Sequence, residues 1–178
     1  HFTVRDRENQ LVFSSGEVEP SGLIRGNDND ADAARFEPHY TEIRSEDQVQ
    51  VYEPVMRDPD GNVTTGLLRA SAFVKDNRLL PRGFDKTTAA PDIAVLGAAR
   101  EDGDFNDGGD RVRYSVDTAG RAGPFRIDVE LRYQPIGFRW AQNLKPYEAA
   151  ETQRFVTWFD AMSAGSSVVL ARTTASAP

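Results

Sequence analysis

A strict alternation of apolar and polar side chains from Phe125 to Tyr133 constrains this fold more than any other feature. Successive side chains of a strand point to opposite faces, so this alternation is typical of a strand with one buried face. An α-helix would distribute the same apolar residues around its axis. The segment therefore predicts a half-buried β-strand. The glycine-containing turn at 119–123 predicts that it forms a hairpin with a strand at 111–116.

Shorter apolar or alternating runs predict further strands. They occupy residues 1–4, 11–16, 48–52, 67–74, 93–96 and 168–171, with turn-forming residues at 6–9 and 58–62 and a small polar tail at 173–178. Only residues 147–162 space their apolar side chains with the period of a helix. The sequence therefore predicts an all-β fold in a single domain, residues 1–178. We expect an antiparallel β-sandwich, immunoglobulin-like or jelly-roll-like, with one helix near the C-terminus.

Composition and charge narrow the classes of function. A chain of 178 residues with 39% hydrophobic and 28% charged residues is large enough for one buried core. A net charge of -7 disfavours binding to nucleic acid or to an anionic membrane surface, because both need clustered Lys and Arg. The absence of cysteine excludes disulfides, zinc–cysteine sites and covalent haem attachment within this chain.

No apolar run approaches the roughly 20 residues that a helix needs to cross a bilayer, so we expect no membrane insertion. The chain opens at His1 directly inside an alternating segment, and its first residues do not have the pattern of a signal peptide. We therefore expect this chain to be a piece of a longer protein.

An acidic segment near the N-terminus is the first candidate metal site. Asp28, Asp30 and Asp32 have the spacing with which a calcium loop directs several carboxylates at one cation. An EF-hand is rejected, because its sixth and twelfth positions would be Ala33 and His39 instead of glycine and glutamate. A looser calcium site and a solvated acidic loop both stay open. In the acidic loop at 101–110, Asp102, Asp104 and Asn106 repeat the same spacing of oxygen ligands, and this loop ranks below the first.

His39 is a separate candidate ligand, and it lies among aromatic residues in the segment 36–40. A histidine in such surroundings is usually a hydrogen-bonded structural residue. Ligation of a metal or a haem is the alternative, and the role of His39 stays open.

Residues 75–85 predict a loop tied to the core. Turn-forming and apolar residues follow one another there, and Pro81 and Gly83 prevent a helix from continuing. Lys75, Asp76 and Arg82 could serve catalysis, but charged residues beside turns usually lie in solvent or pair locally.

Several segments together resemble the C-terminal region of bacterial exported multihaem c-type cytochromes. The segments that carry the resemblance are residues 27–32, 36–40, 48–53, 75–84 and 131–137. In that family the Cys-x-x-Cys-His motifs that attach haem lie upstream of this region. A chain without cysteine fits a segment that follows those motifs.

The resemblance implies a non-catalytic β-sandwich in the periplasm or outside the cell. It would dock against the haem-bearing domain of its parent chain and support electron transport there. Haem would belong to the upstream part, and this chain would hold no cofactor apart from a possible calcium ion. The resemblance leaves the oligomeric state and the redox partner open.

Two other classes of function stay open. A carbohydrate-binding module would use Tyr40, Trp140 or Trp158 as stacking platforms, although the position of Trp158 on the apolar side of the predicted helix favours burial. An enzyme is not expected. The chain has neither a Gly-x-Ser-x-Gly nor a His-Glu-x-x-His motif, and paired carboxylates could act only if the fold brought two of them into one cleft.

Overall fold

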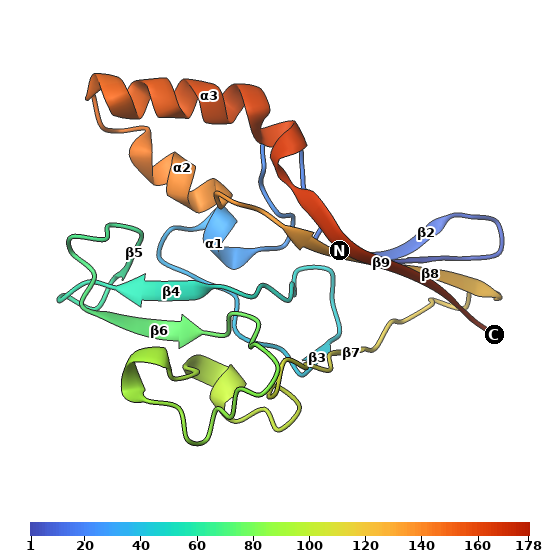
Figure 1. The fold of residues 1–178 in the computed structure, drawn as a ribbon. Coiled ribbons are helices and arrows are strands. Elements are labelled where there is room, and N and C mark those ends of the chain that lie inside the picture. The colour runs from blue at the N-terminus through green and yellow to red at the C-terminus, as the bar shows by residue number, and fades with distance from the viewer.

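The computed structural model describes residues 1–178 as a β-rich chain with mostly antiparallel strands in three separate sheets (Figure 1). The largest sheet has the order β2-β1-β8-β9, from strands Leu11–Ser15, Phe2–Arg5, Phe125–Tyr133 and Val168–Ala177. The second has the order β5-β4-β6, from Val63–Thr64, Pro54–Arg57 and Ala72–Asp76. The third is a short parallel pair, β3 (Glu42–Ile43) with β7 (Arg113–Tyr114).

Five helical segments complete the chain. They are α1 (Asp28–Ala31), α2 (Phe138–Leu144), α3 (Ala150–Ser166) and the 3₁₀ turns η1 (Pro91–Ile93) and η2 (Gly97–Arg100). α2 and α3 lie together at one end of the molecule (Figure 1). No helix of the structure combines the length and the apolar character that a membrane crossing requires.

The first core forms where β8 meets β1 and β2. Val4 lies opposite both Phe13 and Ile127, so the alternation of three strands places their apolar side chains on one face. Val4 and Phe13 cluster there with Ile43 and Phe125, which lie in other parts of the chain. The prediction of a strand at 125–133 and of a first hairpin is confirmed.

A second, smaller core lies beside the three-stranded sheet. Val95, Ala99 and Phe105 are buried together, and Tyr52, Leu80 and Phe84 pack against them. Most of these residues come from loops and 3₁₀ turns. Leu80 and Phe84 hold the loop after β6 against this core, as the sequence predicts for residues 75–85.

The helix predicted at 147–162 is present as α3, but it buries a different face. Val156, Phe159 and Ser163 are buried, whereas Trp158 and Met162 are 62% and 69% exposed. The Ser163 hydroxyl donates a hydrogen bond to the Pro20 carbonyl, which brings a loop against this small residue. The expectation that Trp158 is buried is therefore wrong. The helix α2 was not predicted.

Several strand assignments are also wrong. The predicted hairpin between 111–116 and 125–133 does not form, because β7 pairs in parallel with β3 and both edges of β8 are taken by β1 and β9. Residues 48–52 do not form a strand, and 93–96 contain the end of a 3₁₀ turn. The tail at 173–178 mostly belongs to β9. The β-rich, antiparallel character is therefore confirmed, whereas a sandwich is not.

The first core gives a direct test of stability. Ile43 is fully buried, so Ile43→Ala should lower the free energy of unfolding by about 2–5 kcal/mol through lost burial and a cavity. Leu68 is fully exposed, and Leu68→Ala should change it by no more than about 0.5 kcal/mol. Urea unfolding of both variants measures the difference. Equal effects would contradict this placement of the core.

A buried histidine and two aspartates as the candidate functional site

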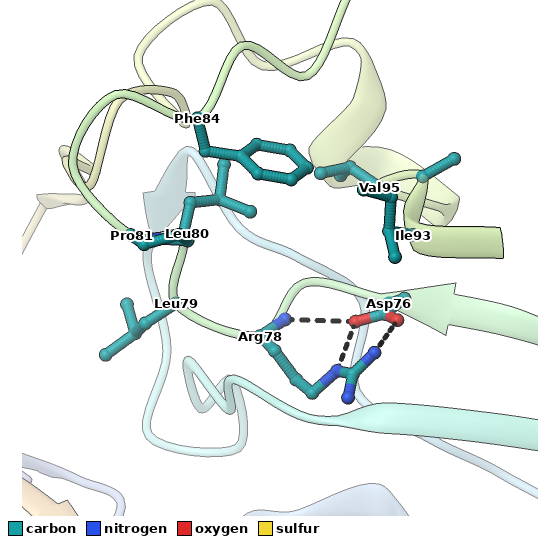
Figure 2. Close-up of a pocket in the computed structure, with 9 residues that line it drawn as sticks. Asp76, Arg78, Leu79, Leu80, Pro81, Phe84, Ile93 and Val95 are labelled. Atoms are coloured by element: carbon teal, nitrogen blue, oxygen red, sulfur yellow. Dashed lines mark hydrogen bonds and ion pairs between the residues drawn. The ribbon is translucent and has the colours of Figure 1, made fainter. Parts of the chain in front are cut away.

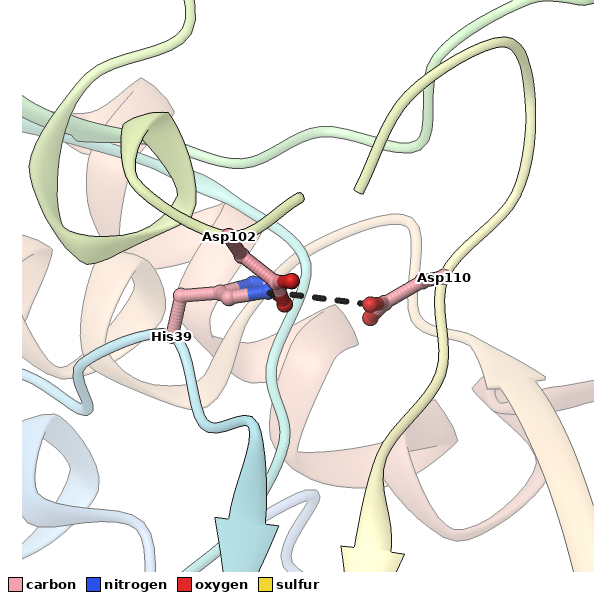
Figure 3. A group of neighbouring side chains, drawn as sticks. All are labelled: His39, Asp102 and Asp110. Atoms are coloured by element: carbon pink, nitrogen blue, oxygen red, sulfur yellow. Dashed lines mark hydrogen bonds and ion pairs between the residues drawn. The ribbon is translucent and has the colours of Figure 1, made fainter. Parts of the chain in front are cut away.

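His39, Asp102 and Asp110 meet in the interior with their functional groups facing one another (Figure 3). Their side chains are only 1%, 6% and 4% exposed. His39 Nε2 lies 3.1 Å from Asp102 Oδ2 and 3.7 Å from Asp110 Oδ1. One ligand atom from each residue lies within 4.8 Å of the other two. Imidazole and carboxylate groups at these separations could together hold a metal ion.

The parallel pairing of β3 and β7 brings His39 to Asp110. Glu42 lies opposite Arg113, and both His39 and Asp110 precede these residues by three positions. Parallel strands keep equal offsets side by side, so the two residues enter the interior together. Asp102 follows η2, whose residue Ala99 is buried in the second core.

The other nitrogen of His39 fixes the tautomer. Nδ1 lies 3.0 Å from Asn77 Nδ2 and 2.9 Å from Gln50 Nε2. Backbone groups fix the orientation of both side-chain amides. Asn77 Oδ1 accepts from the Glu53 N–H, and Gln50 Oε1 accepts from the Tyr40 N–H. Nδ1 therefore faces two N–H donors and acts as the acceptor. The imidazole proton lies on Nε2.

The two carboxylates accept hydrogen bonds but have no Lys or Arg ion pair in the structure. Asp102 accepts from His39 and from the Asp104 N–H. Asp110 accepts from the Arg111 N–H and from the Tyr52 hydroxyl, at 2.7 and 2.5 Å. Burial, and then this bond to Asp110, raise the pKa of Tyr52 above its ordinary range. The negative charge is thus stabilised by hydrogen-bond donors.

Lys75 lies beside this cluster and is almost completely buried. Its Nζ donates to the Val51 carbonyl at 2.9 Å and to Glu53 Oε1 at 3.2 Å. Burial lowers the pKa of Lys75, and the Glu53 carboxylate opposes this effect. Lys75, Asp76 and Arg82 do not form one site, because Asp76 pairs with Arg78 and Arg82 is exposed.

An open cavity of about 280 Å³ lies on the outer side of the second core (Figure 2). Leu80, Phe84 and Val95 form apolar walls, while the Asp76 carboxylate at its edge is bonded to Arg78. None of the three clustered residues lines this cavity. The cavity therefore gives no access to the His39 cluster.

The structure does not bring Asp28, Asp30 and Asp32 together into a metal-binding group. Asp28 pairs with Arg35 at 2.6 Å. Asp30 is buried and accepts from the Ile24 N–H, and burial raises the pKa of its carboxyl group. Asp32 is exposed and accepts from the N–H two residues later, that of Ala34. The short helix α1 directs the three carboxylates to different surroundings, so calcium binding here stays a prediction.

Sequence reasoning identified His39 and Asp102 separately but missed their contact and the part of Asp110. Their separation in sequence gives no spacing signal, because His39 lies 63 residues from Asp102. His39 and Asp110 each lie three residues before a paired residue of β3 or β7, and this relation is informative only once the pairing of these strands is known.

Comparisons with protein-family models, with curated proteins and with solved structures each found no match.

The role of Lys75 can be tested by removing its charge. Lys75→Met should destabilise the protein by about 3 kcal/mol at neutral pH, because Glu53 and the Val51 carbonyl lose a buried partner. Lys145→Met removes an exposed ion pair with Asp160 and should cost less than about 1 kcal/mol. Urea unfolding of both variants provides the comparison. Equal losses would contradict the role of Lys75.

The same variant has a predicted pH dependence. The pKa of Lys75 is lower in the folded state than its ordinary value of 10.5, so between these pKa values the unfolded state binds more protons. The wild type should therefore gain stability relative to Lys75→Met as the pH rises toward 10.5. If the difference in the free energy of unfolding between the wild type and Lys75→Met stays constant or shrinks over this range, burial does not disfavour the charged form of Lys75.

The calcium prediction has its own measurement. If the segment binds calcium, millimolar calcium should raise the melting temperature above that in chelator, and magnesium should do so less. Asp32→Asn should remove the effect without harming the fold, because Asp32 is exposed. Equal melting temperatures in calcium and chelator would reject the site.

Proposed function

We propose that this chain is a non-catalytic docking module that supports the haem-bearing part of an exported multihaem cytochrome. The observation that carries the proposal is an apolar sheet face that the chain itself leaves uncovered. The identity of the partner, the haem chemistry and the periplasmic or extracellular location come from the resemblance alone.

The accessible surface is larger than a self-contained chain of this size requires. It measures 11016 Å² for 19.7 kDa, whereas a typical folded monomer of this mass exposes about 8,600 Å². The excess is about 2,400 Å², and a standard interface buries about 800 Å² per partner. The chain therefore has enough extra surface for an extensive, permanent interface.

The uncovered face begins where the first core ends. Phe125 and Ile127 of β8 pack in that core, but Leu131 and Tyr133 point to the same side of the strand and are exposed. Val168 of β9 lies directly opposite Tyr133, is also exposed and extends this apolar face. In the proposed complex the haem-bearing part covers these side chains and supplies the second layer of a sandwich.

Charge is concentrated on the opposite side of the same strand. The alternate residues of β8 there form ion pairs with one another and with β9, namely Arg126 with Asp128, and Glu130 with Arg132 and Arg172. This side is suited to water, because its charges are already paired. The sheet thus presents one solvated face and one apolar face that is half covered.

The aromatic residues give less support to a carbohydrate-binding module. The Tyr40 hydroxyl donates to Glu37 at 2.6 Å, and its ring packs against the first core. Trp140 and Trp158 lie on different helices. No observation places these rings on one stacking surface, so the docking module is the better supported proposal.

The docking proposal is tested by charge substitution on the apolar face. Leu131→Asp and Tyr133→Asp should weaken association of this chain with the haem-bearing part by at least about tenfold, because each places an unpaired charge in the interface. Leu68→Asp is the control, since Leu68 is exposed in another region. Calorimetric titration measures the affinity. Unchanged affinity, or an upstream gene sequence without Cys-x-x-Cys-His motifs, would contradict the proposal.

A further inference from the structure

We propose that His39, Asp102 and Asp110 bind a divalent first-row transition metal ion. His39 Nε2 and one oxygen of each carboxylate are its protein ligands (Figure 3). This site is independent of the docking face.

The distances from His39 to the two carboxylates are close to those between neighbouring metal ligands. Zinc lies about 2.0–2.2 Å from imidazole nitrogen and carboxylate oxygen, so neighbouring ligands of a tetrahedral site lie about 3.3–3.5 Å apart. His39 Nε2 lies 3.1 Å from the nearer oxygen of Asp102 and 3.7 Å from that of Asp110. The two separations from His39 need shifts of a few tenths of an ångström, and the oxygens of the two carboxylates, which lie within 4.8 Å of each other, would draw together on the ion. A water molecule would supply the fourth ligand.

The charge and the chemistry of the ligands select the ion. Two carboxylates, both almost completely buried, face one imidazole, and neither has a Lys or Arg ion pair. A divalent cation would neutralise them. The imidazole favours zinc or ferrous iron over calcium, and the absence of sulfur ligands disfavours cuprous copper.

Binding requires a proton to move. A metal ion on Nε2 displaces the proton there, so a neutral imidazole must carry its proton on Nδ1. Nδ1 faces the amide nitrogens of Asn77 and Gln50. The Asn77 side chain bonds to two backbone groups, whereas the Gln50 side chain is half-buried and bonds to one backbone group. Gln50 therefore rotates to present its oxygen. The Tyr40 N–H then loses its acceptor, Asp110 loses the hydrogen bond that Gln50 Nε2 donates at 3.3 Å, and Asn77 Nδ2 keeps only the Val51 carbonyl.

This rearrangement predicts that one substitution, at Gln50, strengthens metal binding. The lost hydrogen bonds should weaken metal binding by at least about tenfold relative to a site with a built-in acceptor. Gln50→Glu places a carboxylate beside Nδ1 and should tighten binding by at least that factor, because a carboxylate orients a ligating histidine.

The experiment uses the whole chain with zinc and with cobalt as a spectroscopic probe. Zinc at a hundredfold excess over Kd should raise the melting temperature by about 5–10 °C relative to chelator. Cobalt should give the visible absorption of a tetrahedral site. Asp102→Asn and Asp110→Asn should abolish both signals. Asp104→Asn, which changes an exposed carboxylate of the same loop, should leave both unchanged.

A second measurement needs no variant and so does not depend on the folding of one. The chain has two histidines, so nitrogen NMR can follow each ring separately. Zinc should move the His39 proton from Nε2 to Nδ1. An unchanged His39 tautomer together with equal melting temperatures would overturn the proposal. Signals that vanish in His1→Ala and persist in Asp110→Asn would also overturn it, by assigning the metal to the N-terminus.

Discussion

The fold depends on a buried network of hydrogen bonds that meets at His39. Asn77 alone bonds to the His39 ring, the Val51 carbonyl and the Glu53 N–H, so it joins three segments. Lys75 adds a second link to the segment of Val51 and Glu53. Removing one partner of such a network leaves the others buried without bonds, which costs more than each bond contributes. The network therefore specifies one arrangement of these loops.

The same network explains how long loops stay ordered without strands. The loop at 101–110 is held against the loop at 79–86, since Asp107 accepts from the Gly83 N–H and Asn106 accepts from the Lys86 N–H. Lys86 also donates to the carbonyls of Ala99 and Asp102. Ser167 Oγ is the only buried side-chain polar atom of the structure without a partner. Side-chain bonds thus take the place of a longer sheet around the candidate metal site.

Sequence periodicity predicted the elements whose structure is local. β8 and the first hairpin follow from alternation, and α3 follows from helical spacing. Alternation failed at 48–52, because Gln50 and the Val51 carbonyl bond to the His39 network instead of to a neighbouring strand. The buried face of α3 was mistaken for a similar reason, since its neighbour is the loop at Pro20.

The candidate site was less predictable than the fold, because its three residues converge through tertiary structure alone. His39 and Asp110 meet through the pairing of two-residue strands, and such short strands have no periodicity to detect. The first acidic segment shows the opposite case, since Asp28, Asp30 and Asp32 have the spacing of a calcium loop but separate environments. Spacing shows which side chains a loop could present together. Whether they meet depends on what the backbone between them must bond to.

The polar network and the uncovered sheet face have different requirements. The network is closed within the chain, because its donors and acceptors satisfy one another. The apolar side of β8 extends beyond the residues that the first core covers. β9 pairs only with β8, and eight of its ten residues are exposed. A ten-residue edge strand with exposed backbone groups and apolar side chains invites association. The chain thus has an interior whose polar groups bond to one another and a sheet that a partner would complete.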